Sequence, residues 1–160
     1  MIWQDLMIDR WADEAALRTA TASAFGVPAD AVAVVDSPAQ LAASPPAAQV
    51  ILERDRQHRD FPLQILVILR DDELTRRFDG FEGVLRVAED LAKHLDATVL
   101  FAEGPVSPSE WVRVRPTGQV DVVSLDVDET GDVDSYFVVD QRALPLDEQR
   151  SESNAGRLTA

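Results

Sequence analysis

Acidic side chains recur at short spacing in the stretch SLDVDETGDVDSYF, residues 124–137, and carboxylate oxygens are ligands that calcium prefers. The order of residue types resembles the start of a calcium-binding loop, with the series Asp126, Asp128, Thr130, Gly131, Asp132, Val133 and Asp134. An EF-hand also needs a helix on each side and a Glu at its last ligand position, where this sequence has Phe137. Because both flanks alternate like strands, we predict a hairpin loop in which Gly131 supplies a positive φ and the aspartates face water. A calcium ion bound weakly between the crowded carboxylates is the alternative.

Few other residues have types and spacings that suggest a chemical role. Asp90 and His94 are four residues apart on a predicted helix, but two ligands do not make a metal site, and we expect His94 at the exposed side of that helix. His58 lies in a polar turn, RQHRD. The segment GFEG, residues 80–83, has the glycine spacing of a nucleic-acid clamp loop, yet its acidic neighbours fit a helix N-terminus better. No nucleophile, phosphate-binding or zinc-protease motif occurs, so we predict no enzyme activity, no cofactor and no metal.

Composition narrows the choice of partner. The chain of 160 residues carries a formal net charge of −14, which makes nucleic acid an improbable partner because phosphate binding needs a basic surface. It contains no cysteine, so disulfides and thiolate metal sites are excluded. No apolar run approaches the ~20 residues of a membrane span, and the first residues lack the pattern of a secretory signal. These features indicate a cytoplasmic protein that does not bind membranes and whose partner is basic or neutral.

The sequence does not decide the type of the first element. Residues 1–12 fit either a strand or the start of a helix. A helix follows, with Asp13 as its N-cap and Gly26 as its end. Residues 31–37, AVAVVDS, are typical of a strand, whereas residues 38–49 contain three prolines and predict a connecting loop.

The remaining elements are more regular. Residues 50–56, VILERDR, indicate a half-exposed or edge strand, and residues 61–70, FPLQILVILR, a central one. Residues 79–96 have apolar side chains at helical spacing. Four strand-like segments follow, over 97–103, 110–116, 119–127 and 135–140, and a Pro-Thr-Gly turn joins the second to the third. We therefore predict an α+β fold with a mostly antiparallel sheet of about six to eight strands packed on two helices.

The domain boundary is set by composition. Residues 1–144 hold all predicted elements and should form a single α+β domain. Residues 145–160, PLDEQRSESNAGRLTA, lack apolar periodicity and predict a polar, disordered tail.

The candidate contact residues are acidic and aromatic. Trp111 begins a predicted strand beside a loop rich in Ser and Pro; its indole either packs in the core or anchors an interface with a charged rim. The candidate partner-binding set is Trp111, Asp126, Asp128, Glu129, Asp132 and Asp134. An acidic surface also has the plain interpretation that it keeps the protein soluble.

The general plan resembles a known family of inhibitors. A compact, acidic, cysteine-free chain with a strand such as DFPLQILVIL, a helix VLRVAEDLAKHLDATVLF and a terminal series of hairpins looks like the small immunity proteins that neutralise bacterial polymorphic toxins. The resemblance implies stoichiometric inhibition, with acidic loops that meet a basic toxin and accelerate association. It transfers no functional residue.

Two other functions remain open from the sequence. The size and charge also resemble type III secretion chaperones, although this chain has more C-terminal strands than that plan requires. A cupped sheet could instead hold a small molecule in a metal-free pocket, because neither histidine falls in a predicted strand. A protein binder should show a flat acidic patch, and a small-molecule binder should show a buried apolar cavity. The sequence leaves the oligomeric state open, and a homodimer is one option.

Overall fold

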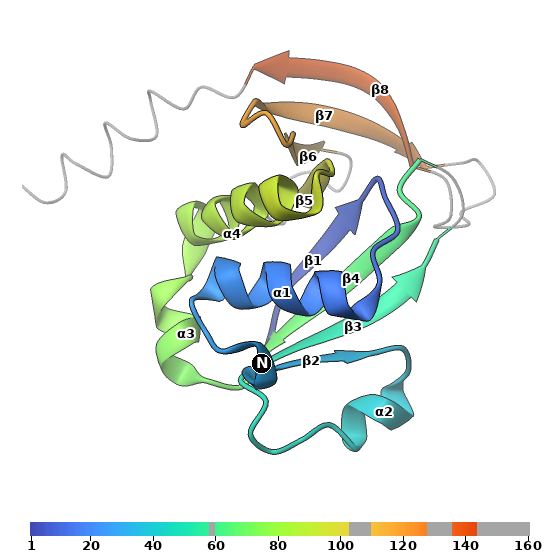
Figure 1. The fold of residues 1–160 in the computed structure, drawn as a ribbon. Helices are drawn as coiled ribbons and strands as arrows, with labels where there is room; N and C mark the ends of the chain where they lie inside the picture. Colours follow the sequence, from blue (N-terminus) through green and yellow to red (C-terminus); the bar gives the residue numbers. More distant parts are fainter. Residues whose placement is uncertain (58–59, 103–109, 128–135, 144–160) are drawn as a thin grey trace, which may run out of the picture.

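A single sheet of eight strands runs through the molecule, in the order β2-β3-β4-β1-β5-β6-β7-β8 (Figure 1). The computed structural model describes residues 1–57, 60–102, 110–127 and 136–143, of which 125–127 and 136–143 are described as strand backbone. The strands are β1 (Ile2–Ile8), β2 (Val32–Val35), β3 (Val50–Arg56), β4 (Leu63–Leu69), β5 (Val99–Ala102), β6 (Glu110–Val114), β7 (Val120–Val127) and β8 (Tyr136–Ala143). The helices are α1 (Glu14–Phe25), α2 (Pro38–Ala42), α3 (Asp72–Arg77) and α4 (Gly80–Leu95), and a short 3-10 helix, η1 (Ala29–Ala31), precedes β2.

The pairing of the strands confirms the predicted fold class. All neighbouring strands are antiparallel except β2 and β3, which are parallel. β1 lies in the middle of the sheet, where Leu6 is opposite Ile65 of β4 on one side and Phe101 of β5 on the other. β5 to β8 form the predicted meander. The protein is therefore α+β, with a mostly antiparallel sheet.

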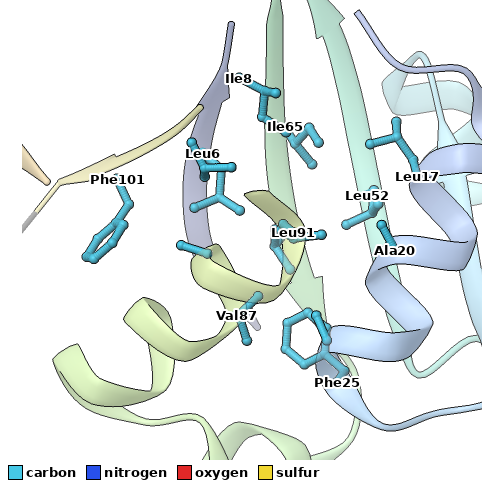
Figure 2. Packing of buried hydrophobic residues seen from close by; sticks show 14 of the residues in the cluster. Leu6, Ile8, Leu17, Ala20, Phe25, Leu52, Ile65, Val87, Leu91 and Phe101 are labelled. Atoms are coloured by element: carbon cyan, nitrogen blue, oxygen red, sulfur yellow. The ribbon is translucent and has the colours of Figure 1, made fainter. Parts of the chain in front are cut away.

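The main core lies between the sheet and the two long helices. α1 and α4 pack against each other on the same face of the sheet (Figure 1). Figure 2 shows the side chains that meet there: Leu17, Ala20 and Phe25 from α1, Val87 and Leu91 from α4, and Leu6, Ile8, Leu52, Ile65 and Phe101 from the strands. Phe25 is fully buried and makes edge-to-face contacts with Trp3 and Phe78, at centroid distances of 5.3 and 5.0 Å. This packing supplies most of the buried apolar surface that stabilises the fold.

Local sequence signals fix the ends of these helices. The Asp13 side chain accepts a hydrogen bond from the N–H of Ala16, as the predicted N-cap should, and Gly26 ends α1 in the left-handed region at φ 67°. α4 begins at Gly80, so the GFEG segment is the start of a helix as predicted. At Gly83 a Cβ atom would collide with the backbone of Phe78, so only glycine allows this close approach.

One prediction about a single element is wrong. Residues 38–49 are not all loop, because Ser37 caps α2 through its side chain and Pro38 occupies the first turn of that helix. The polar segment after β4, for which no helix was predicted, contains α3, which Asp71 caps. Of the two alternatives for residues 50–56, the half-exposed strand is the one observed, because the later residues of β3 are partly or fully exposed while β3 lies between β2 and β4 and the edge belongs to β2. The predicted tail, residues 145–160, lies outside the described residues. Within the described part of the chain, no helix is both long and apolar enough to cross a membrane.

We expect Phe25→Ala to lower the free energy of unfolding by about 3–5 kcal/mol, because it opens a cavity between α1, Trp3 of β1 and Phe78, the residue that follows α3. Urea unfolding followed by circular dichroism measures the change. Phe25→Leu is the control, since it keeps much of the apolar volume and should cost clearly less. Equal losses in the two variants would show that Phe25 is not packed as described.

Candidate functional site

The acidic stretch that opened the sequence analysis connects two strands. β7 and β8 pair antiparallel, with Val127 opposite Tyr136, so the segment is the connection of a hairpin and not the loop between two helices. Asp126 belongs to β7, where its backbone is opposite Phe137. The other candidate residues of this stretch, Asp128, Glu129, Asp132 and Asp134, lie outside the described residues. The weak calcium site therefore stays a hypothesis about this connection.

Trp111 lies in β6, on the face of the sheet that α1 and α4 do not cover. Its exposed fraction is 9%, and it packs in a second cluster with Met7, Phe61, Leu100 and Val123. An indole with so little exposed surface fits the core-packing interpretation that the sequence also allowed. Of the acidic candidates, only Asp126 is among the described residues, and its description is limited to its backbone.

An acidic face remains on the middle strands, opposite α1 and α4. Alternation along each strand directs Asp5, Glu53, Asp55, Gln64 and Leu66 to this side, which we call the open face. Leu66 is opposite Glu53 on one neighbour and Asp5 on the other, so a half-buried apolar side chain is set between two carboxylates. Among the described helices only α2 packs on this side, and it does so at the β2 end, where Leu41 contacts Ala33, Val35 and Ile51.

A chain of amides links the carboxylates of the open face. Gln64 donates a hydrogen bond to Asp5 at 2.8 Å, and Gln57 donates to Gln64 at 2.8 Å and to Asp55 at 3.0 Å. Burial raises the pKa of the Asp5 carboxyl, and the hydrogen bonds from Gln64 and from the Leu6 backbone offset this only in part. Oδ1 of Asp5 is buried and has no hydrogen-bond partner among the described residues. Glu53 has no ion pair within the described part of the chain. The open face thus carries negative charge that the described side chains do not neutralise.

The structure also contains two shallow hollows. One, of about 260 Å³, is bordered by the start of β1 and by Phe81, Val84 and Phe101, next to the exposed side chain of Ile2. The other, of about 390 Å³, follows the outer edge of β2 between α1 and α2. Its rim carries Glu14, Arg18, Asp30 and Asp36. Both are open to solvent, and neither has the enclosed apolar shape of a typical small-molecule site.

A buried ion pair stabilises the sheet next to the open face. Arg113 of β6 and Asp121 of β7 are opposite each other and form two hydrogen bonds, at 2.8 and 2.6 Å. Their side chains are only 12% and 10% exposed. The Asp121 carboxylate raises the pKa of Arg113, so the guanidinium stays charged. This pair has a structural role, because both partners are occupied with each other.

The histidine prediction is confirmed where it can be checked. His94 is exposed on α4, with Nε2 3.1 Å from the Ser23 hydroxyl and Nδ1 2.8 Å from the Asp90 carbonyl oxygen. No group of three or more metal-ligating side chains occurs among the described residues. His58 lies outside the described residues.

Sequence reasoning did not identify the two surfaces that the fold leaves accessible. The open face combines residues from β1, β3 and β4, and Asp5 and Gln64 are far apart in the sequence. In VILERDR, the alternation of Val50 and Leu52 with charged residues indicated a half-exposed strand but not which neighbouring strands complete this face. The β2 edge was not identified, because residues 31–37 were predicted only as a strand and an edge position was one of two alternatives for residues 50–56.

The raised pKa of Asp5 predicts a pH dependence. The folded state holds the Asp5 proton more tightly than the unfolded state, so its contribution to stability is full below the unfolded pKa and is lost as the pH rises through the folded pKa. Wild type should therefore gain stability relative to Asp5→Asn as the pH is lowered from about 7 to about 4.5. Urea unfolding at several pH values tests this, with Asp60→Asn as the control at an exposed carboxylate. A difference between wild type and Asp5→Asn that is constant with pH would contradict the prediction.

Removing one partner of the buried pair should be costly. Asp121→Ala takes two charge-assisted hydrogen bonds from the Arg113 guanidinium, so we expect it to lower the free energy of unfolding by about 3 kcal/mol. The double substitution Arg113→Leu with Asp121→Val removes both charges and should recover most of that loss. Denaturant unfolding of the three proteins measures both effects. A double variant as unstable as Asp121→Ala would show that the pair itself is not responsible.

Comparisons with known proteins add no relative. No family model, no curated protein and no solved structure matches the chain. Its function is therefore inferred from the open face and the β2 edge.

Proposed function

We propose that the protein is a protein-binding module that recognises a basic partner through the open face of its sheet. In its most specific form it acts in the cytoplasm as an immunity-type inhibitor, which occludes a toxin or effector. The observation that carries the proposal is the row Glu53, Leu66 and Asp5 across three neighbouring strands, where an apolar contact is flanked by carboxylates on a rigid surface.

Charge supports a basic partner. The strand residues of β1, β3 and β4 that are directed to the open face include three acids and no Lys or Arg. The chain as a whole carries −14, so its field attracts cationic surfaces over a Debye length and raises the association rate. A basic residue that contacts Glu53 would also supply the counter-charge that the described residues do not.

The shape of the surface supports a protein more than a small molecule. The open face is built on paired strands and presents a broad surface. The hollow beside Ile2, at about 260 Å³, is smaller than the usual range for drug-sized ligands, which starts near ~300 Å³. The hollow along β2, at about 390 Å³, lies within that range, but it is open to solvent and has a charged rim. The small-molecule alternative is therefore less well supported. The secretion-chaperone alternative predicts that the partner binds in an unfolded state. Measuring whether captured proteins bind when folded or only when denatured would distinguish this alternative from the proposed function.

A matched pair of charge reversals tests the proposal. The double variant Glu53→Lys with Asp55→Lys changes the open face, while Glu82→Lys with Glu89→Lys changes exposed positions on α4. Each reversal adds two units, so both doubles move the net charge from −14 to −10. We expect the open-face double to weaken binding of the captured partner by about 10–100-fold, whereas the α4 double should change it by less than about threefold.

The measurement has two steps. Tagged protein is used to capture partners at about 50 mM and about 500 mM NaCl, and the captured protein is then purified for calorimetry with each variant. Recovery of a basic protein whose affinity falls only in the open-face double supports the proposal. An equal loss in both doubles would show that net charge alone matters. A captured partner that is acidic, or that binds both doubles as wild type does, would overturn the proposed surface.

A further inference from the structure

The outer edge of β2 has free hydrogen-bonding capacity at its centre. The carbonyl of Ala31 accepts a hydrogen bond from the N–H of Gln49, just before β3. Because the backbone groups of successive residues point to opposite sides of a strand, those of Ala33 and Val35 point toward β3, and those of Val32, Val34 and Asp36 point away from it. The N–H of Val32 is taken by Ala29 of η1.

The other end of the edge is also closed. The N–H of Asp36 donates to the side chain of Gln40 at 2.7 Å. What remains directed outward is the carbonyl of Val32 and both backbone groups of Val34. Within the described residues, no hydrogen bond from outside the β2–β3 ladder reaches Val34. An unpaired strand edge of this kind is a template for another strand.

The groove around this edge is the size of an extended peptide. All four residues of β2 line the hollow of about 390 Å³, and four residues of extended chain span roughly 13 Å. The α1 side of the groove is charged, with Glu14 and Arg18, and the α2 side is uncharged, with Gln40, Ala43, Ser44 and Pro45. An added strand would direct alternate side chains to these two walls.

The rim favours a basic segment. Glu14 holds Arg18 in an ion pair at 2.5 Å, and Arg54 holds Asp36 at 2.6 Å, which lowers the pKa of the Asp36 carboxyl. Asp30, exposed in η1 just before β2, has no ion pair within the described part of the chain. The two ion pairs are neutral, so the net negative charge of Glu14, Arg18, Asp30, Asp36 and Arg54 comes from Asp30. A Lys or Arg of the bound segment would be placed there.

We propose that β2 accepts an extended, basic segment of a partner protein as a ninth strand of the sheet, with a cationic side chain of that segment at Asp30. The inference rests on the proposed binding of a protein partner and adds how one segment of that partner is held. A second copy of the chain is disfavoured as the occupant, because two molecules of charge −14 repel and the two walls of the groove narrow the approach.

The test uses a defined probe. An acetylated and amidated octapeptide that alternates Val with Lys is titrated into ¹⁵N-labelled protein, and its counterpart with Glu in place of Lys is the charge control. We expect the Lys peptide to change the NMR chemical shift of the Val34 amide with a dissociation constant below about 1 mM, and the Glu peptide to bind at least about tenfold more weakly. Failure of the Lys peptide to shift the Val34 amide at about 5 mM overturns the proposal.

A backbone change separates strand addition from other binding. Val34→Pro removes the outward N–H, and proline is tolerated on an edge strand where that group faces solvent. Val34→Ala is the matched control, since it removes the side chain but keeps the donor. We expect Val34→Pro to weaken the Lys peptide by at least about tenfold and Val34→Ala by less than about threefold. Equal affinities in the two variants would exclude pairing with β2.

Modified peptides keep the test valid even if Val34→Pro does not fold. Methylation of backbone nitrogens at one set of alternate positions should abolish binding to wild type, and methylation at the other set should be tolerated, because only one set faces β2. Equal effects of the two sets overturn the proposal. Size-exclusion chromatography with light scattering identifies a dimer; a dimer that Val34→Pro breaks would assign the edge to a second copy and would also overturn it.

The two proposals can fail separately. If the open-face double loses the captured partner while Val34→Pro still binds that partner and the Lys peptide as Val34→Ala does, the proposed function stands and the edge site is wrong. If only Val34→Pro loses the partner, the edge is the binding site and the open face is not.

Discussion

The position of β1 in the centre of the sheet is the constraint on which the other elements depend. β1 pairs with β4 on one side and with β5 on the other, and it is the strand that connects β2, β3 and β4 to β5 and the strands beyond it. The amide of Leu69 donates to the carbonyl of Met1, so the pairing continues to the end of β4. On the helix side, Leu6 and Ile8 of β1 lie under α1 and α4, and Trp3 contacts Phe25. Loss of β1 would divide both the sheet and the core.

Both proposed surfaces follow from the one-sided arrangement of the long helices. α1 and α4 cover one face of the sheet, and α2 is too short to cover the other face beyond the β2 end (Figure 1). The middle strands are therefore left with half-buried side chains, and acidic residues there avoid a large apolar patch. The same short α2 leaves a groove beside β2 instead of covering its edge. An acidic strand face and an unpaired strand edge are complementary means of holding a polypeptide.

Sequence patterns predicted the elements whose signals are local. The periodicity of residues 79–96, the Asp13 cap and the alternating strands of the meander gave α4, most of α1 and the order of β5 to β8. The central role of residues 2–8 was not predictable, because nothing in that segment indicates that its partners are β4 and β5. An edge position remained one of two alternatives for β3, because its charged residues are partly or fully exposed even though β3 lies between two strands and Arg54 and Arg56 stack on Trp11. α2 was missed because its three nearby prolines outweighed the capping signal of Ser37.

The central place of β1 has a consequence for folding kinetics. During synthesis β1 is made before both of its partners. Ile2 pairs with Ile68 of β4, so most of the first half of the chain must be synthesised before this pair can form. β5, the other neighbour, is completed only after α4. Contacts of such long separation must overcome loop-closure entropy before they stabilise anything, so this topology belongs with the slower-folding mixed domains. Until β4 has been made, β1 has two unpaired edges, and until α4 and β5 follow it still has one, so the nascent chain depends on its acidic charge to stay apart from other chains.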